Sequence, residues 1–268
     1  TEWLKRLIKL MLAPVQSGHT GQLRLLAIDA STVQERAAIQ TTYRLHTSID
    51  LVTLQVQQMR ITDDKTAEGV NNFELREGDI VLLDRGYNHN RLLVPLIDRG
   101  ADIILRYNPH GLCLYEQADL SSKINWMQRL REYTTDQSFA VHLLHQGKAI
   151  PCWLHAHALS AEQAAESRRK VKATAKSKGQ TASDKRLLLA GWVLVLTSIA
   201  PDVLSFDSIC NLYRTRWQIE LAFKRMKSLL NIDQLRAKKG SKLAELYLLA
   251  KLLYTLVVEK LTSSQTHH

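Results

Sequence analysis

Leu23-Arg-Leu-Leu-Ala-Ile-Asp29 is an apolar run that ends in an acid and is followed by the small residues of 30–32. A second stretch, Ile80-Val-Leu-Leu-Asp84, has the same form, and Arg85-Gly86 closes it as a turn. Apolar runs this short, bounded by turn residues, favour buried strands. Because ligands of an open α/β sheet bind at its carboxyl edge, we expect Asp29 and Asp84 to converge there. Taken singly, either acid could instead start a turn or cap a helix.

Strand and helix signals alternate along the rest of the chain, which predicts an α/β fold with a mixed sheet flanked by helices. A long alternating stretch near residue 55 predicts an antiparallel start to that sheet. Expected strands cover 41–46, 50–61, 79–84, 102–107 and 188–197, with a hairpin over 139–158. Expected helices cover 90–99, 122–131, 206–230 and 241–261.

The helix expected over 206–230 carries the pattern Tyr213-x2-Arg216-x3-Glu220-x6-Lys227. At about 100° per residue, these four side chains fall within a sector of about 60°. A separate apolar stripe at 219, 223, 226 and 230 lets the helix pack on a core while its polar face lines a cleft. The alternative is an ordinary surface helix in which Glu220 pairs with Lys224 one turn on. Metal-dependent phosphoryl transfer needs two or three carboxylates close together, and Asp29, Asp84 and Glu220 form such a set.

Several landmarks in fixed order carry a family resemblance. They are Leu26-Ala-Ile-Asp-Ala-Ser-Thr32, Tyr43-Arg-Leu-His46, Leu82-Leu-Asp-Arg-Gly-Tyr87, Arg106-Tyr-Asn-Pro109 and the 213–227 pattern. Over nearly its whole length the chain resembles the catalytic part of bacterial insertion-sequence DDE transposases, specifically the family numbered four. The resemblance implies an RNase H-like domain interrupted by a largely β insertion. It assigns 1–107 to the first part of the catalytic domain, 108–205 to the inserted subdomain and 206–268 to the C-terminal helical part.

The resemblance also implies a chemistry. Asp29, Asp84 and Glu220 would hold two Mg²⁺ ions, with Mn²⁺ as a substitute, for nicking, hairpin formation and strand transfer at insertion-sequence ends. Tyr213, Arg216 and Lys227 would bind terminal phosphates. Double-stranded DNA would be the partner of a homodimer that pairs two ends. Two alternatives remain: a non-catalytic DNA-binding remnant of a transposase, and a stand-alone RNase H-like nuclease.

Two further residues have a functional and a structural interpretation. Trp192 matches the family's tryptophan that stacks a flipped base, since base extrusion needs an aromatic platform, but a tryptophan in an apolar strand is usually a core residue. Arg85 could contact a DNA phosphate or only buttress the turn after Asp84.

Positive charge is concentrated in one segment. The chain has a net charge of +10 and a pI near 9.6, which favours a polyanionic partner. The segment 168–186 contains eight basic residues and one acidic residue, Asp184. Ser160 and Gln163 predict a capping box for a helix that ends near Gly179. We expect Arg168, Arg169, Lys170 and Lys172 to lie along DNA phosphates; the alternative is a solvated charged helix.

Other classes of protein are disfavoured. Three cysteines without a C-x-x-C pair suggest neither a disulfide framework nor a zinc site. The sequence shows no secretory signal and no apolar run long enough for a membrane span, which predicts a cytoplasmic, nucleoid-associated protein. Because the chain opens at Thr1 without a methionine, we expect a fragment that lacks an end-recognising N-terminal region.

Overall fold

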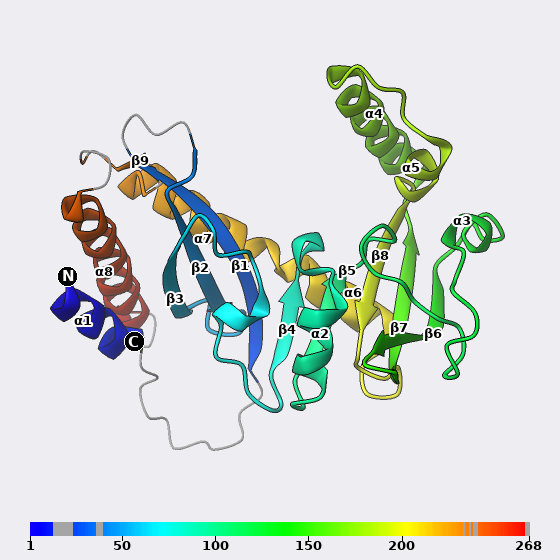
Figure 1. Ribbon diagram of the computed structural model, residues 1–268, viewed down its shortest axis with the longest axis horizontal. Helices are drawn as coiled ribbons and strands as arrows, with labels where there is room; N and C mark the ends of the chain where they lie inside the picture. The colour runs from blue at the N-terminus through cyan, green and yellow to red at the C-terminus, as the bar shows by residue number, and fades with distance from the viewer. Residues whose placement is uncertain (13–23, 36–39, 233, 236, 238–240, 266–268) are drawn as a thin grey trace. The chain divides into compact units, whose positions relative to one another are not determined.

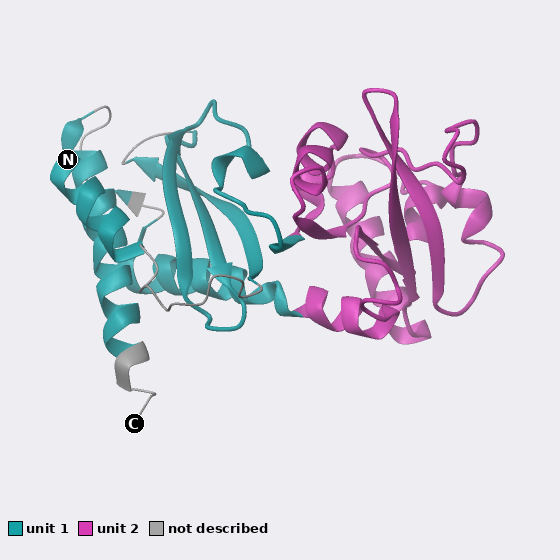
Figure 2. Cartoon of the chain, turned by 90° about the horizontal axis from the view of Figure 1, so that it is seen from below, with its two compact units in different colours: residues 1–82, 215–268 teal, residues 83–214 magenta. Residues whose placement is uncertain are grey.

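The computed structural model describes residues 1–12, 24–35, 40–232, 234, 235, 237 and 241–265. Figure 1 shows the helices and strands, and Figure 2 shows two compact units, one made of 1–82 and 215–268 and the other of 83–214. These divisions fall at other residues than 107/108 and 205/206, so the boundaries of an inserted subdomain stay a prediction. The predicted α/β class, a mixed sheet with helices, is confirmed, and its RNase H-like assignment stays a prediction.

The first unit is built on a mixed sheet. Its strands are β1 (Leu25–Glu35), β2 (Tyr43–Asp50), β3 (Val56–Asp63) and β4 (Ile80–Leu83), in the order β3-β2-β1-β4. β2 runs antiparallel to both β1 and β3, whereas β4 runs parallel to β1. The short strand β9 (Gln234–Leu235) pairs with the end of β1, and η1 (Val70–Asn72) lies between β3 and β4. The predicted antiparallel start of the sheet is therefore confirmed.

Three helices pack on one face of this sheet: α1 (Glu2–Leu12), α7 (Trp217–Leu230) and α8 (Lys242–Gln265). Ala27 and Val33 of β1 belong to the same buried core as Ile219 and Phe223 of α7. Because side chains alternate along a strand, the odd-numbered residues of β1 between them also point towards α7. Elsewhere in this unit, Arg24 forms a two-point ion pair with the buried carboxylate of Asp79, at 2.7 and 2.6 Å.

The second unit contains an antiparallel sheet. Its strands are β5 (Asp102–Arg106), β6 (Gln137–His145), β7 (Lys148–Ala158) and β8 (Trp192–Thr197), in the order β5-β8-β7-β6. Its helices are η2 (Arg85–Tyr87), α2 (Asn90–Ile97), α3 (Trp126–Arg129), α4 (Ala161–Ser177), α5 (Asp184–Leu189) and α6 (Phe206–Thr215). The predicted hairpin over 139–158 is confirmed as β6 and β7, with positive φ angles at Gln146 and Gly147 in its turn.

Several expected boundaries need correction. The strand expected over 50–61 begins only at Val56, because Asp50 ends β2, and the helix expected over 122–131 is the short α3. β1 does not end at Asp29 but runs to Glu35, because residues 30–33 keep their pairing with β2 and the last two pair with β9. The helix expected over 206–230 is two helices, α6 and α7, separated by a turn at Arg216. The strand expected from 188 begins at Trp192, because Leu188 and Leu189 belong to α5.

Candidate active site

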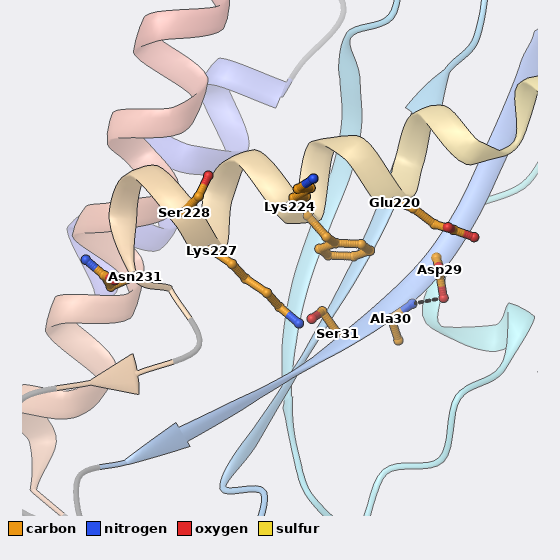
Figure 3. A pocket seen from close by; sticks show the side chains of 9 residues that line it. Asp29, Ala30, Ser31, Glu220, Lys224, Lys227, Ser228 and Asn231 are labelled. Atoms are coloured by element: carbon orange, nitrogen blue, oxygen red, sulfur yellow. Dashed lines mark hydrogen bonds between the residues drawn. The ribbon is translucent and has the colours of Figure 1, made fainter. Parts of the chain in front are cut away.

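An open pocket of about 560 Å³ lies between β1 and α7 in the first unit (Figure 3). Asp29 and Ser31 reach it from β1, and Glu220, Lys224 and Lys227 reach it from α7. Figure 3 shows the Glu220 carboxylate directed towards Asp29 and the Lys227 side chain directed towards Ser31. Two acids and two amines from segments far apart in sequence thus share one cavity.

Local periodicity explains how each element presents these groups. Asp29 and Ser31 are two residues apart in β1, so both point to the face covered by α7. Glu220, Lys224 and Lys227 are spaced by four and three residues, which places them on one side of α7. Ile219, Phe223 and Met226 of the same helix are buried in the core. The apolar stripe therefore anchors the helix that carries the polar groups, as the sequence predicted.

Arg216 forms ion pairs with both carboxylates of the pocket. Its Nη1 lies 3.5 Å from Oδ2 of Asp29, and its Nη2 is hydrogen-bonded and ion-paired to Oε1 of Glu220. The Arg216 and Asp29 side chains are 13% and 19% exposed, whereas Glu220 is 57% exposed. The other oxygen of Asp29, Oδ1, accepts a hydrogen bond of 2.8 Å from the backbone N–H of Ala30. One guanidinium therefore offsets the mutual repulsion of two acids that would otherwise face each other.

Lys224 is a pocket residue that the sequence analysis missed. The alternative interpretation assigned Lys224 as a surface partner of Glu220. In the structure, Glu220 forms its ion pair with Arg216, and Lys224 lines the cavity. The signal that could have found it is its position between Glu220 and Lys227 on the same helix face. For Ser31, the signal is its spacing of two from Asp29 on a strand.

Asp84 lies in the second unit, at the end of β4. Its Oδ1 accepts a hydrogen bond of 2.7 Å from the N–H of Gly86, so its side chain caps the short helix η2. Arg85 is exposed in that helix, and Arg106 ends the strand β5. Burial lowers the pKa of Arg106 to about 10, and the positive charge of Arg85 contributes to the same shift. Two arginines therefore lie near each other beside the turn that Asp84 opens, an environment that favours an anion.

The remaining predicted residues also lie in the second unit. Tyr213 is half-buried in α6. Trp192 is only 7% exposed at the start of β8, opposite Ala158 of β7, which fits a core residue; its proposed stacking on a flipped base stays a prediction.

The basic segment begins on α4. The predicted capping box is confirmed, because Ser160 Oγ accepts from the N–H of Gln163 and the Gln163 side chain accepts from the N–H of Ser160. Arg168 donates to the carbonyl of Leu187, while Arg169 and Lys170 pair with Glu166. Lys172 is exposed on the same helix. At about 100° per residue, Arg168, Lys172 and Lys176 lie within about 80° of one another, so α4 has a cationic face.

Metal-binding groups are present, but they are not gathered into a complete set. In the part of the chain that the structure describes, no three His, Cys, Asp or Glu side chains are grouped as a metal site. The oxygens of Asp29 and Glu220 in one open pocket are the donors that hard divalent ions prefer, so the pocket fits such an ion. Among the same described residues, no helix is long and apolar enough to cross a membrane.

Comparisons with known proteins identify the family of the chain. Residues 20–256 match the family model described as a transposase DDE domain. The chain is 30% identical over 251 residues to the transposase of insertion sequence IS421 from Escherichia coli, covering 91% of this chain and 67% of that protein. It is 29% identical over 196 residues to the transposase of IS231F from Bacillus thuringiensis subsp. israelensis, covering 67% of this chain and 40% of that protein.

A solved structure of the piggyBac transposase synaptic complex with hairpin DNA aligns with 87% of this chain and 46% of that chain. The alignment has 10% identity and a TM-score of 0.47. Membership of the insertion-sequence family numbered four stays a prediction. The match over most of the chain and the IS421 relative settle the broader assignment: the chain belongs to the transposase DDE domain family, whose members are divalent-metal-dependent enzymes of DNA phosphoryl transfer.

Proposed function

We propose that this chain is the catalytic part of a DNA transposase that nicks DNA at insertion-sequence ends with two Mg²⁺ ions and then forms hairpins and transfers strands. The observation that supports this most directly is the convergence of Asp29 and Glu220, from β1 and α7, on one open pocket with Lys227. When bound, such metal ions activate the attacking oxygen and stabilise the leaving 3′ oxygen.

Asp84 is the third acid of the proposed metal-binding set. β1 and β4 run parallel, and Ala27 pairs with Leu82. Asp29 and Asp84 each come two residues after that pair, which supports equivalent positions along neighbouring strands. The carboxylates of Asp29, Asp84 and Glu220 would hold and orient the ions.

Arg216 would change partners during the reaction. Without metal it neutralises Asp29 and Glu220. With Asp29 and Glu220 engaged in holding divalent ions, the Arg216 guanidinium would pair with a DNA phosphate in the two-point geometry that arginine favours. Lys227 and Tyr213 would bind neighbouring phosphates of the end. These groups position the DNA, and proton transfer is not assigned to them.

Outside the pocket, the cationic face of α4 would carry backbone contacts to double-stranded DNA, with Arg85 adding one beside Asp84. Two copies would form a homodimer to pair two ends, acting at the bacterial nucleoid.

Replacing Lys172 and Lys176 together by glutamine is expected to flatten the salt dependence of DNA binding. Each lost phosphate contact lowers the slope of log K against log salt by about 0.9 on B-form DNA, so the double variant should lose about 1.8. Fluorescence anisotropy across a salt series measures the slope. A matched variant that neutralises Lys65 and Lys148, two exposed lysines outside α4, should keep the wild-type slope. Equal slopes in both variants would mean that α4 is a solvated charged helix that does not contact DNA phosphates.

The proposed function is tested by incubating the chain with Mg²⁺ and DNA that carries the native element's end, beside its Glu220→Ala variant. We expect the wild-type chain to produce nicks and hairpins and the variant to produce neither, because the variant lacks one metal-binding carboxylate. Glu220 is largely exposed, so its removal should leave folding intact. Denaturing gel electrophoresis separates nicked and hairpin products.

The other outcomes identify the alternatives. Binding without cleavage by the wild-type chain would indicate a DNA-binding remnant. Cleavage of any DNA, independent of the end sequence and of Tyr213 or Lys227, would indicate a stand-alone nuclease. Cleavage that persists in Glu220→Ala would show that the active site is elsewhere.

A further inference from the structure

Helix α8 is apolar on two opposite faces. Its inner face contributes Ala244, Leu248, Leu252 and Leu256 to the core of the first unit, where each is at most 3% exposed. Helices that are apolar all round are normally buried all round, because one exposed apolar face leaves a large apolar area in water. In the first unit, however, the outer face of α8 is open to solvent (Figure 1).

We call the exposed apolar residues of this outer face the outer stripe. Its N-terminal half comprises Leu243, Leu246, Tyr247 and Ala250. Its C-terminal half comprises Tyr254, Val257, Val258 and Leu261. At about 100° per residue, all eight fall within about 120°, centred opposite the buried face. Leu243, Tyr247, Tyr254 and Leu261 are 46%, 46%, 58% and 63% exposed.

The outer stripe contains no charged residue, although α8 as a whole carries five. The helix carries Lys242, Glu245, Lys251, Glu259 and Lys260, and all five lie on its flanks or its inner side by the same angular count. An uninterrupted apolar stripe of about 27 Å, from 243 to 261 at 1.5 Å per residue, is what a helix presents to another helix. Contiguous exposed apolar surface of this kind marks an interaction site.

The order of residues in the outer stripe identifies the partner. Reversing the helix about Leu252 places each half of the stripe on the other: Leu243 meets Leu261, the pair Leu246 and Tyr247 meets Val257 and Val258, and Ala250 meets Tyr254. A surface that matches itself after a two-fold rotation is the signature of an isologous dimer interface. We propose that α8 packs antiparallel on α8 of a second copy of this chain, with the two-fold axis beside Leu252.

Side-chain size favours the antiparallel direction over the parallel one. In the antiparallel pair, the large ring of Tyr254 lies opposite the small Ala250 of the partner subunit, so the two helices can approach closely. In a parallel pair, Tyr254 would meet its own copy while Ala250 faced Ala250 across a gap. Large residues facing small ones give the interdigitated packing that protein interfaces share with protein interiors.

This interface is expected to be weak by itself, because one helix pair buries less area than a standard interface. The inference builds on the pairing of two copies proposed above and supplies the surface for it. Its test therefore uses neither DNA nor metal, so that its failure leaves the proposed catalytic function untouched.

Cysteine crosslinking distinguishes the direction of the pair. The exposed native thiol, Cys113, is first removed as Cys113→Ser in the full chain. Leu243→Cys and Leu261→Cys are then made as separate chains and oxidised alone and mixed. An antiparallel pair about Leu252 gives crosslinked dimers in the mixture and none from either chain alone. Crosslinking of each chain alone would mean a parallel pair, and no crosslinking in any sample would mean no pair; both outcomes overturn the inference.

A second measurement guards against adventitious crosslinks. Sedimentation velocity over a concentration series should show a reversible dimer for the wild-type chain and at least about tenfold weaker association for Tyr254→Glu, which places an unpaired charge in the stripe. Val203→Glu is the matched control, since Val203 is 70% exposed in the second unit. Equal association of both variants, or a wild-type chain that stays monomeric throughout, would overturn the inference.

Discussion

Asp29→Asn is expected to slow Mg²⁺-dependent nicking by on the order of 10³-fold or more, the scale seen when a member of a catalytic group is removed. The substitution keeps the side chain's size and leaves an oxygen to accept the 2.8 Å hydrogen bond from Ala30. It removes the negative charge that makes the carboxylate a ligand for a hard divalent ion. Initial rates on end DNA at saturating Mg²⁺ measure the effect.

A separate readout shows whether the lost charge acts through the metal. Ligands that bind only the folded state raise its melting temperature by mass action. Added Mg²⁺ should therefore raise the melting temperature of the wild-type chain more than that of Asp29→Asn. Asp64→Asn, at an exposed acid just after β3, should behave as wild type in both assays. If Asp29→Asn kept a tenth or more of the wild-type rate, Asp29 would not be a metal ligand.

Local signals were sufficient to predict much of the fold. The apolar runs that form β4 and β5 are short and end at turn residues. Gln146-Gly147 indicates the hairpin of β6 and β7, and the positive φ angles of both residues suit such a turn. The capping box at Ser160 was readable because both of its partners lie within four residues. In each case the interactions that fix the structure are near in sequence.

Non-local pairing explains why the predicted end of β1 was wrong. The residues after Asp29 are small and resemble a turn, yet β2 supplies backbone partners that extend β1 to Glu35. Strand boundaries of this kind depend on tertiary context more than on residue preference. No glycine or proline stands at Arg216, where α6 ends and α7 begins. The helical periodicity of the sequence therefore predicted one continuous helix.

The candidate site was only partly predictable for the same reason. Periodicity could place Glu220, Lys224 and Lys227 on one face of α7, because these residues belong to a single helix. It could not bring Asp29 to Glu220, since β1 and α7 are separated by most of the chain. The need of phosphoryl transfer for several carboxylates, together with the family resemblance, predicted that convergence, and the structure of the first unit shows it for these two acids. The shared guanidinium of Arg216 was not predicted.

Acidification is expected to destabilise the chain strongly between pH 6.5 and pH 4, through two buried histidines. His46 in β2 and His155 in β7 are 0% and 1% exposed. Each accepts or donates one hydrogen bond to a neutral hydroxyl: His46 Nε2 with Thr62 Oγ1 at 2.9 Å, and His155 Nδ1 with Ser138 Oγ at 3.0 Å. Burial lowers the pKa of both to about 4, and the charges of Arg44 and Arg60 add to the shift at His46.

The sign follows from which state binds the protons. A lowered pKa means that the unfolded chain takes up a proton at each histidine before the folded chain does, so this contribution to stability is complete above pH 6.5 and is lost as the pH falls towards 4. At pH 5 each histidine should cost about 2 kcal/mol relative to pH 7.5, at 1.36 kcal/mol per pKa unit. Together they amount to about 4 kcal/mol, close to the lower end of the net stability of a typical domain, about 5–15 kcal/mol.

Urea denaturation at pH 7.5 and pH 5 measures the effect in the wild-type chain and in His46→Gln, His155→Gln and the exposed control His110→Gln. Other groups titrate in this range, so the informative quantity is how far each variant reduces the difference in unfolding free energy between the two pH values. We expect a reduction of about 2 kcal/mol for His46→Gln and again for His155→Gln, and none for His110→Gln. Because His46 and His155 lie in different units, the double variant should show the sum of the two reductions. Equal pH dependence in all five proteins would mean that neither histidine is held neutral by burial.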